Sequence, residues 1–217
     1  QLGAMTVNAG YASHVLCVAS SHFGSAEKQF RYPLAYANQR PLSATWTVTG
    51  CGAFVVGTSG RVKITGITTG KIVDYGVRDS MNMGACMAPA AADTIAQNLQ
   101  DFGRTPEDYD QIITGDLGKV GKEILLTLMK EQGVDISRQH ADCGIEIYDA
   151  ETQDTHSGGS GCGCSAVTLG AYILDQLAEG RWKRVLFVPT GALLSTVSFN
   201  EGQTIPGIAH GVVLETA

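Results

Sequence analysis

The sequence predicts an α/β protein made of two duplicated halves, each a mixed sheet with layered helices, of which the first half is incomplete. Short apolar segments bounded by glycine, serine or histidine alternate with longer segments whose apolar residues recur at helical spacing. Strands that alternate with helices of this length are typical of a mostly parallel sheet with helices on both faces. A similarity between distant parts of the chain predicts the duplication.

Two pairs of segments carry this similarity. Residues 10–18 align with residues 180–188, and each segment runs from a glycine at a helix end through a short turn into an apolar strand. Residues 49–56 align with residues 208–214 as glycine-containing strands. Two matches in the same order indicate duplicated halves. The predicted units are residues 1–60, which end the first half, and residues 61–217, which form the second.

The first half begins in the middle of an element. Residues 1–10 have the pattern of the last turns of a helix closed by glycine, without a start signal, so we expect the chain to be a fragment of a longer protein. Residues 15–19 are apolar and predict a strand buried on both faces. Residues 20–43 form a polar, aromatic-rich loop whose length is typical of a functional segment. Residues 45–56 predict a strand pair or bulged strand around two glycines.

In the second half, proline and glycine mark the ends of helices. We expect a helix to begin at Gly84, with Pro89 in its first turn, where proline breaks no hydrogen bond, and with Gly103 after its end. Residues 105–108 have the sequence of a helix start. The other predicted elements are strands over 61–71, 111–114, 143–148 and 185–188, helices over 118–132 and 167–179, and a closing apolar segment over 204–215.

Composition excludes several classes of protein. The 217 residues are 44% hydrophobic and 17% charged, which suffices for a buried core, and the net charge of −6 argues against a nucleic-acid partner. Six cysteines are too few for a disulfide scaffold at this length, so we expect a reducing compartment. Cys162 and Cys164 lack the second pair that a zinc site needs, and we expect neither metal nor cofactor. No apolar run reaches the length of a membrane span, so membrane association is expected to be peripheral.

A glycine-rich bend over residues 154–166 is the most distinctive stretch of the chain, and it leads directly into the helix predicted over 167–179. The first N–H groups of a helix have no partner within it, so the bend predicts a site for a carboxylate, phosphate or oxyanion. A close backbone crossing with two small buried thiols explains the same glycines. The residues alone leave both interpretations open.

Several runs of the sequence are similar to one known family. They are residues 20–22, 27–33, 47–50, 87–95, 108–110, 114–117, 158–162, 190–195 and 208–213. Together they resemble the stage V sporulation protein AD family, thiolase-like proteins of spore-forming bacteria, over essentially the whole chain. The resemblance implies a thiolase-like fold and a longer parent chain. Thiolase-type enzymes carry their nucleophilic cysteine at the start of the helix whose tail opens this sequence, so the matching position lies upstream of Gln1.

The resemblance also implies a function. A member of this family is expected to bind dipicolinic acid, free or as its calcium chelate, and to act with the other proteins of its sporulation operon. The expected roles are uptake of this acid into the developing spore and its release in germination. The expected location is the spore inner membrane, as a peripheral protein facing the interior of the forespore or mother cell. Because thiolase folds usually pair, a homodimer is expected.

The residues at the expected catalytic positions argue against catalysis. A thiolase or condensing enzyme needs a thiolate, histidines that move protons and an oxyanion hole. Where condensing enzymes carry a histidine, after the strand over 111–114, this chain has Gly115 and Asp116. A carboxylate donates no hydrogen bond to a developing enolate at neutral pH unless its pKa is strongly raised. Two alternatives stay open: an acyl-CoA-dependent thiolase or ketoacyl synthase whose nucleophile lies upstream, and a structural scaffold for membrane partners.

Dipicolinate is a small, flat dianion, so its site is expected to combine N–H donors, cations or hydroxyls and an apolar wall. Asp116 would repel a dianion, so we expect it to orient a donor, to bind the ligand through water, or to cap a turn. We expect His140 and His156 to be exposed, His210 to be a hydrogen-bonded core residue, and Trp46 to be a packing residue. The candidate ligand-binding residues, gathered where strands end, are His22, Lys28, Arg31, Asp116, Ser160, Gly161, Cys162, Gly163, Cys164, Thr190 and Gly191.

Overall fold

The structure is a computed structural model that describes residues 1–30 and 40–217, apart from the side chains of residues 27–30. Its largest sheet contains β4 (Val62–Thr68), β11 (Gly211–Thr216), β8 (Arg184–Val188), β5 (Gln111–Thr114) and β6 (His140–Asp142), in that order. β8, β5 and β6 are parallel, whereas β11 is antiparallel to both of its neighbours. The sheet is therefore mixed, and its parallel strands are the ones that connect through helices.

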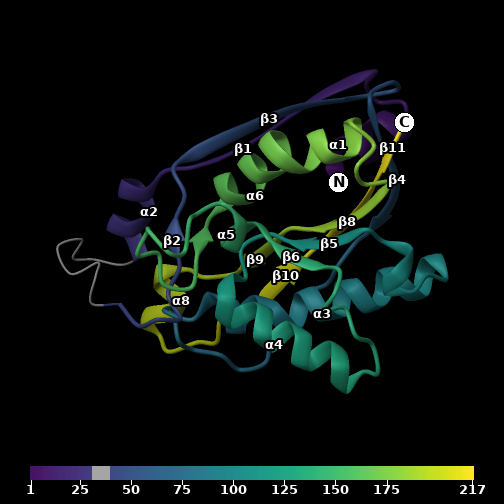
Figure 1. Ribbon diagram of the computed structural model, residues 1–217. Coiled ribbons are helices and arrows are strands. Elements are labelled where there is room, and N and C mark those ends of the chain that lie inside the picture. Colours follow the sequence, from purple (N-terminus) through teal and green to yellow (C-terminus); the bar gives the residue numbers. More distant parts are fainter. Residues whose placement is uncertain (31–39) are drawn as a thin grey trace.

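The helical elements are α1 (Leu2–Asn8), α2 (Phe23–Phe30), α3 (Met83–Phe102), the 3₁₀ turn η2 (Pro106–Asp108), α4 (Gly118–Glu131), α5 (Cys143–Glu146), α6 (Cys162–Thr168), the π-helical turn η3 (Leu169–Ile173), α7 (Leu174–Ala178) and α8 (Thr196–Asn200). Figure 1 shows α3 and α4 on one side of the five-stranded sheet and α6 on the other. Among the described residues, no helix has both the length and the hydropathy to cross a bilayer.

Among the residues that the structure describes, three smaller strand pairs accompany this sheet. β1 (His14–Ser21) and β3 (Gly50–Gly57) are antiparallel and lie beyond α6, so this helix is enclosed between two sheets (Figure 1). β8 and β11 are antiparallel as well, which fits the internal similarity of residues 180–188 to residues 10–18 and of residues 208–214 to residues 49–56. β2 (Trp46–Thr47) pairs in parallel with β7 (Gly159–Ser160), and β9 (Thr190–Ala192) pairs with β10 (Gly207–Ala209). The β2–β7 pair connects the first predicted half to the glycine-rich bend.

Alternation along the central strands produces two cores. On β5, Ile112 packs with residues of α3 and α4, whereas Ile113 packs on the opposite face with Ile173 and Leu177. Successive side chains of a strand point to opposite faces, and both faces of β5 are covered, so its sequence is apolar without alternation. The continuous apolar runs of the central strands therefore follow from their position between two helical layers.

The prediction that residues 15–19 form a strand buried on both faces is wrong. β1 covers this segment, but its residues alternate between exposed and half-buried. α1 and α6 pack on one face of the β1–β3 pair, whereas Leu16, Val18 and Val55 are exposed, at 66%, 57% and 70% of their surface. The segment is apolar because both faces of this strand carry hydrophobic side chains. In the part of the chain that the structure describes, only one face is covered.

Two other local predictions are wrong. Residues 143–146 form α5 instead of a strand, because the backbone bonds within its own turn directly after β6, with the Ile147 N–H 3.1 Å from the Cys143 carbonyl oxygen. Pro89 lies in the second turn of α3, since the helix begins at Met83, where the side chain of Asn82 caps it. Proline at this position removes one hydrogen bond of the helix. The end of α3 is as predicted, with Gly103 in the left-handed conformation at φ 57°.

Candidate functional site

The sequence-predicted site lies around the start of α6, where β1, β5 and β8 end. Asp116, in the turn after β5, accepts a hydrogen bond from the Gly161 backbone N–H at 2.8 Å and another from the Thr190 hydroxyl at 2.9 Å. Ser21, the last residue of β1, accepts one from the Gly163 N–H at 2.9 Å and donates to the Val48 carbonyl at 2.6 Å. Three segments distant in sequence therefore converge on the glycine-rich bend.

These contacts change the interpretation of the bend. The sequence predicted that the first N–H groups of the helix face outward, but those of Gly161 and Gly163 bond to protein oxygens. Asp116 supplies the negative charge that a helix start favours, so it caps the turn, one of the roles expected for it. The prediction that the N–H groups at these two positions are free is wrong, because side chains from other segments accept their hydrogen bonds.

The glycines of the bend are required by close backbone contacts. Gly161 has φ 96°, a conformation that side chains with a Cβ rarely adopt. At Gly163, a Cβ would lie 2.6 Å from the Gly50 carbonyl oxygen and 2.6 Å from the Ser21 hydroxyl. The interpretation of this stretch as a close backbone crossing is confirmed.

The two thiols of the bend differ in environment. Cys164 is fully buried, and its Sγ lies 3.9 Å from the Gly115 carbonyl oxygen. Burial, with the nearby Asp116 charge as a second cause, raises the pKa of the Cys164 thiol far above its usual value, which opposes formation of a thiolate. Cys162 is exposed. Among the described residues, no three His, Cys, Asp or Glu side chains are placed to share a metal ion.

The other predicted site residues occupy varied positions. His22 follows β1 and is exposed, with its Nδ1 3.2 Å from the Ser25 hydroxyl. Ser160 is buried in β7, and Gly191 pairs with Ile208 in the β9–β10 ladder. Lys28 falls in α2 but its side chain is outside the described part, and Arg31 lies outside the described residues altogether. The structure thus brings Asp116, Gly161, Cys162, Gly163, Cys164 and Thr190 together at the start of α6.

A buried carboxylate that the sequence gave no reason to select holds the turn before α4. Asp142 is 0% exposed and accepts hydrogen bonds from the Thr114 hydroxyl at 2.6 Å, the Leu117 N–H at 2.9 Å and the Gly118 N–H at 3.0 Å. Burial raises the pKa of Asp142, and these hydrogen bonds oppose that shift. Because Asp116 directly precedes Leu117, Asp142 also holds the backbone next to Asp116.

His140 lies beside this carboxylate, and the prediction that it is exposed is wrong. Only 6% of its surface is accessible, and its Nε2 lies 3.0 Å from the Thr114 hydroxyl. Burial, with the nearby Lys122 charge as a second cause, lowers the pKa of His140 to about 3. This histidine is therefore neutral at physiological pH. His210 accepts a hydrogen bond from the Gly70 N–H at 3.1 Å, and it is half-buried.

An aromatic cluster lies beside the bend. The Trp46 ring stacks on Phe23, with centroids 5.4 Å apart, and meets the His156 ring edge-on at 5.9 Å. The guanidinium carbon of Arg40 lies 4.1 Å from the centroid of the Trp46 ring. The His156 side chain is only 5% exposed, so the prediction that it is exposed is wrong. No sequence pattern indicated this cluster, because its members come from separate segments.

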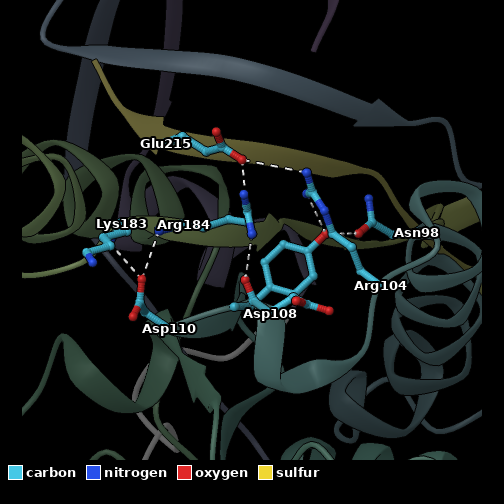
Figure 2. Close-up of polar contacts among 8 residues, drawn as sticks. Asn98, Arg104, Asp108, Asp110, Lys183, Arg184 and Glu215 are labelled. Atoms are coloured by element: carbon cyan, nitrogen blue, oxygen red, sulfur yellow. Dashed lines mark hydrogen bonds and ion pairs between the residues drawn. The ribbon is translucent and has the colours of Figure 1, made fainter.

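A second polar network lies at the opposite ends of β5 and β8 (Figure 2). Asp110 accepts hydrogen bonds from the backbone N–H groups of Lys183 and Arg184, at 2.6 and 2.9 Å. Arg184 also donates to Glu215 on β11. An open groove of about 680 Å³ adjoins this network, and its lining includes Arg61 and Lys183. The network joins three strands of the sheet and lies away from the candidate site.

Comparison with known proteins identifies the family. A family model for stage V sporulation protein AD matches residues 1–215. Stage V sporulation protein AD of Bacillus subtilis (strain 168) is 50% identical over 212 residues, which cover 97% of this chain and 62% of that protein. The chain therefore spans less than two thirds of the length of this relative.

Solved structures of condensing enzymes share the fold at low identity. The 3-oxoacyl-[acyl-carrier-protein] synthase III of Aquifex aeolicus VF5 has a TM-score of 0.57 and 14% identity, covering 99% of this chain and 61% of that chain. The synthase III of Thermus thermophilus has a TM-score of 0.54 and 16% identity, covering 100% of this chain and 63% of that chain. Identity this low shows the fold alone, and it confirms the expected thiolase-like architecture. With its matched sequence and this fold, the chain belongs to the stage V sporulation protein AD family.

Proposed function

We propose that the protein of which this chain forms part binds dipicolinic acid, free or as its calcium chelate, without converting it. Family membership supports a role in sporulation, and the thiolase-like fold supplies strand ends that converge on one region, where ligands of α/β sheets collect. The proposed roles are uptake of the acid into the developing spore and its release in germination. Both depend on the resemblance described above.

The observation that carries the non-catalytic part of this proposal is the position of the Asp116 carboxylate. An oxyanion hole needs N–H donors that are open toward the charge developing in the transition state. Here the Gly161 N–H and the Thr190 hydroxyl already donate to Asp116. A second negative charge at this place would be repelled by the carboxylate. The arrangement therefore favours a structural use of the helix start over acyl transfer.

The proposed partners and location follow from the same family resemblance. We propose that the protein acts with the other products of its sporulation operon, at the inner membrane of the spore, as a peripheral protein. A homodimer is the proposed assembly. Fractionation of spore membranes with a high-salt wash tests the peripheral association, because a peripheral protein is released by the wash and an integral one is retained.

Calorimetry on the full-length protein tests ligand binding. Titration with pyridine-2,6-dicarboxylate should release or absorb heat and raise the unfolding temperature, whereas pyridine without carboxylates should do neither. Absence of both signals at millimolar ligand would overturn the proposal and leave the structural scaffold as the surviving alternative.

Mass spectrometry tests the enzymatic alternative. Incubation of the full-length protein with an acyl-CoA should leave every cysteine unmodified if the protein only binds its ligand. A stoichiometric acyl adduct on a single thiol would instead support an acyl-CoA-dependent thiolase or ketoacyl synthase whose nucleophile lies upstream of this chain.

A further inference from the structure

Two buried nitrogen atoms of the aromatic cluster have no hydrogen-bond partner among the described residues: Nε1 of Trp46 and Nδ1 of His156. Buried polar atoms in native proteins are almost always paired, and an exception indicates a ligand, an ion or a water. The His156 side chain is 95% enclosed, because only 5% of it is exposed. The two nitrogen atoms are therefore enclosed, although Phe23 and Trp46 are half-buried residues, and they belong to two rings that meet edge-on.

The cluster adjoins the candidate site through the backbone. Phe23, which stacks on Trp46, directly follows the site residue His22. The backbone N–H of Trp46 bonds to the Gly158 carbonyl at 2.8 Å, and Trp46 lies opposite Gly159 in the β2–β7 ladder. The rings therefore lie next to the glycine-rich bend, on the side where the chain enters it.

The chemistry of the cluster suits a carboxylate group. Trp46 Nε1 carries a hydrogen and can only donate. His156 Nδ1 carries a hydrogen in one neutral tautomer and in the imidazolium form, so it can donate as well. The Arg40 guanidinium over the indole ring adds positive charge beside Trp46, whereas the carboxylate that lies 3.7 Å from His156 Nε2 belongs to Asp154 and is largely in solvent. Two N–H donors beside a cation and an aromatic surface are the features that bind an aromatic carboxylate.

The start of α6 offers less to such a ligand. Its Gly161 and Gly163 N–H groups are already engaged, and the Asp116 carboxylate there is negative. We propose that Trp46 Nε1 and His156 Nδ1, next to Arg40, hold a carboxylate of the pyridine dicarboxylate. This inference rests on the proposed function, and it moves the recognition of the ligand's charge from the helix start to the aromatic cluster.

Tryptophan fluorescence can report on this cluster directly, because the chain has two tryptophans. Trp182 packs edge-on against Tyr172, in contact with the core beside α7. In a Trp182→Phe variant of the full-length protein without further tryptophans, Trp46 is the only emitter. Its emission, excited at the red edge of indole absorption, should change on titration with pyridine-2,6-dicarboxylate. The change should saturate at the same concentration as the heat in calorimetry.

Two substitutions test the assigned atoms. Trp46→Phe keeps an aromatic ring but removes the N–H, and it should weaken binding about tenfold, as expected for a hydrogen bond to a charged group. The matched control Trp182→Phe should bind like the wild type. His156→Ala should weaken binding similarly, and His156→Asn should restore part of it, because asparagine tolerates the φ of 52° at this position and supplies an N–H donor. Circular dichroism and thermal unfolding establish that each variant folds.

The outcomes separate this inference from the proposed function. Heat of binding with unchanged Trp46 emission, and wild-type affinity in Trp46→Phe, would overturn the inference and leave the proposed function intact. In that case a buried water is the occupant of the cluster. No heat at all would overturn the proposed function, and the inference with it. Coincident heat and fluorescence, with weaker binding in Trp46→Phe and His156→Ala, would support both.

Discussion

Removal of the Asp142 side chain tests the network that holds the candidate site. In the native structure, the Asp142 carboxylate accepts hydrogen bonds from the Thr114 hydroxyl and the N–H groups of Leu117 and Gly118, at 2.6, 2.9 and 3.0 Å. In Asp142→Ala these three donors lose their acceptor. Each buried donor left without a partner costs about 1–3 kcal/mol. Removal of the carboxylate also removes the free-energy cost of burying its charge. We therefore expect a net loss of about 3–5 kcal/mol in the free energy of unfolding.

Urea unfolding of the full-length protein, followed by circular dichroism, measures this loss. Asp142→Asn keeps the shape of the side chain and one acceptor oxygen, so its loss should be intermediate. The matched control is Asp135→Ala: this carboxylate is exposed, accepts a hydrogen bond from the Ser137 N–H at 2.9 Å and lies 3.9 Å from the exposed Lys130 ammonium. Its removal should cost less than about 1 kcal/mol. Equal midpoints for Asp142→Ala and Asp135→Ala would refute the role assigned to Asp142.

Three further predictions follow from single side chains. Gly163→Ala places a Cβ 2.6 Å from a backbone carbonyl oxygen and should lower the free energy of unfolding in urea by about 2–3 kcal/mol. The control Gly133→Ala has open space around it and φ 78°, so its free energy of unfolding should fall by about 1 kcal/mol. An alkylating reagent should label exposed Cys162 in the native protein and buried Cys164 only after unfolding, as mass spectrometry would detect. In the folded protein, burial lowers the pKa of His140 to about 3, whereas in the unfolded chain a histidine has a pKa of about 6.5. Between these two pH values the unfolded state binds a proton that the folded state does not. The free energy of unfolding should therefore fall on acidification by up to about 1.4 kcal/mol per pH unit. His140→Gln should flatten this decline, and an unchanged pH dependence of unfolding would show that another group causes it.

Periodicity in the sequence was sufficient to predict the elements that a local pattern of apolar residues determines. The strand over 111–114 and the helix beginning at Gly118 have the predicted starts, because apolar spacing alone decides them. The helix start over residues 105–108 is likewise a local pattern, and η2 begins there as predicted. Segments decided by a distant partner could not be read in this way. Residues 143–146 have strand-like composition, yet they form a short helix in which Gly144 packs against the backbone of the distant Gly159.

The glycine-rich bend was correctly predicted to lead into a helix, although α6 begins at Cys162 and not at Val167, and the hydrogen bonding of the bend was not predicted. The glycine-rich bend identified the start of α6 because glycine density is a local signal. The partners of its N–H groups are 45 residues away at Asp116 and 142 residues away at Ser21. Such contacts depend on the order of the strands, which sequence spacing does not contain. For the same reason, the burial of His140 and His156 and the aromatic cluster around Trp46 became evident only in three dimensions.

The distribution of charge decides where a dianion can be held. A ligand carboxylate about 6 Å from Asp116 would be repelled by about 3 kcal/mol at an effective dielectric constant of about 20. That repulsion would cancel the gain from one or two hydrogen bonds to a charged group. Beside Trp46, the Arg40 guanidinium would attract the same carboxylate, and the repulsion from Asp154, whose carboxylate lies 3.7 Å from His156 Nε2, is screened because that side chain is 85% exposed. A single fold can thus use its glycine-rich bend to fix its own carboxylate and use the adjacent aromatic cluster to bind that of a ligand.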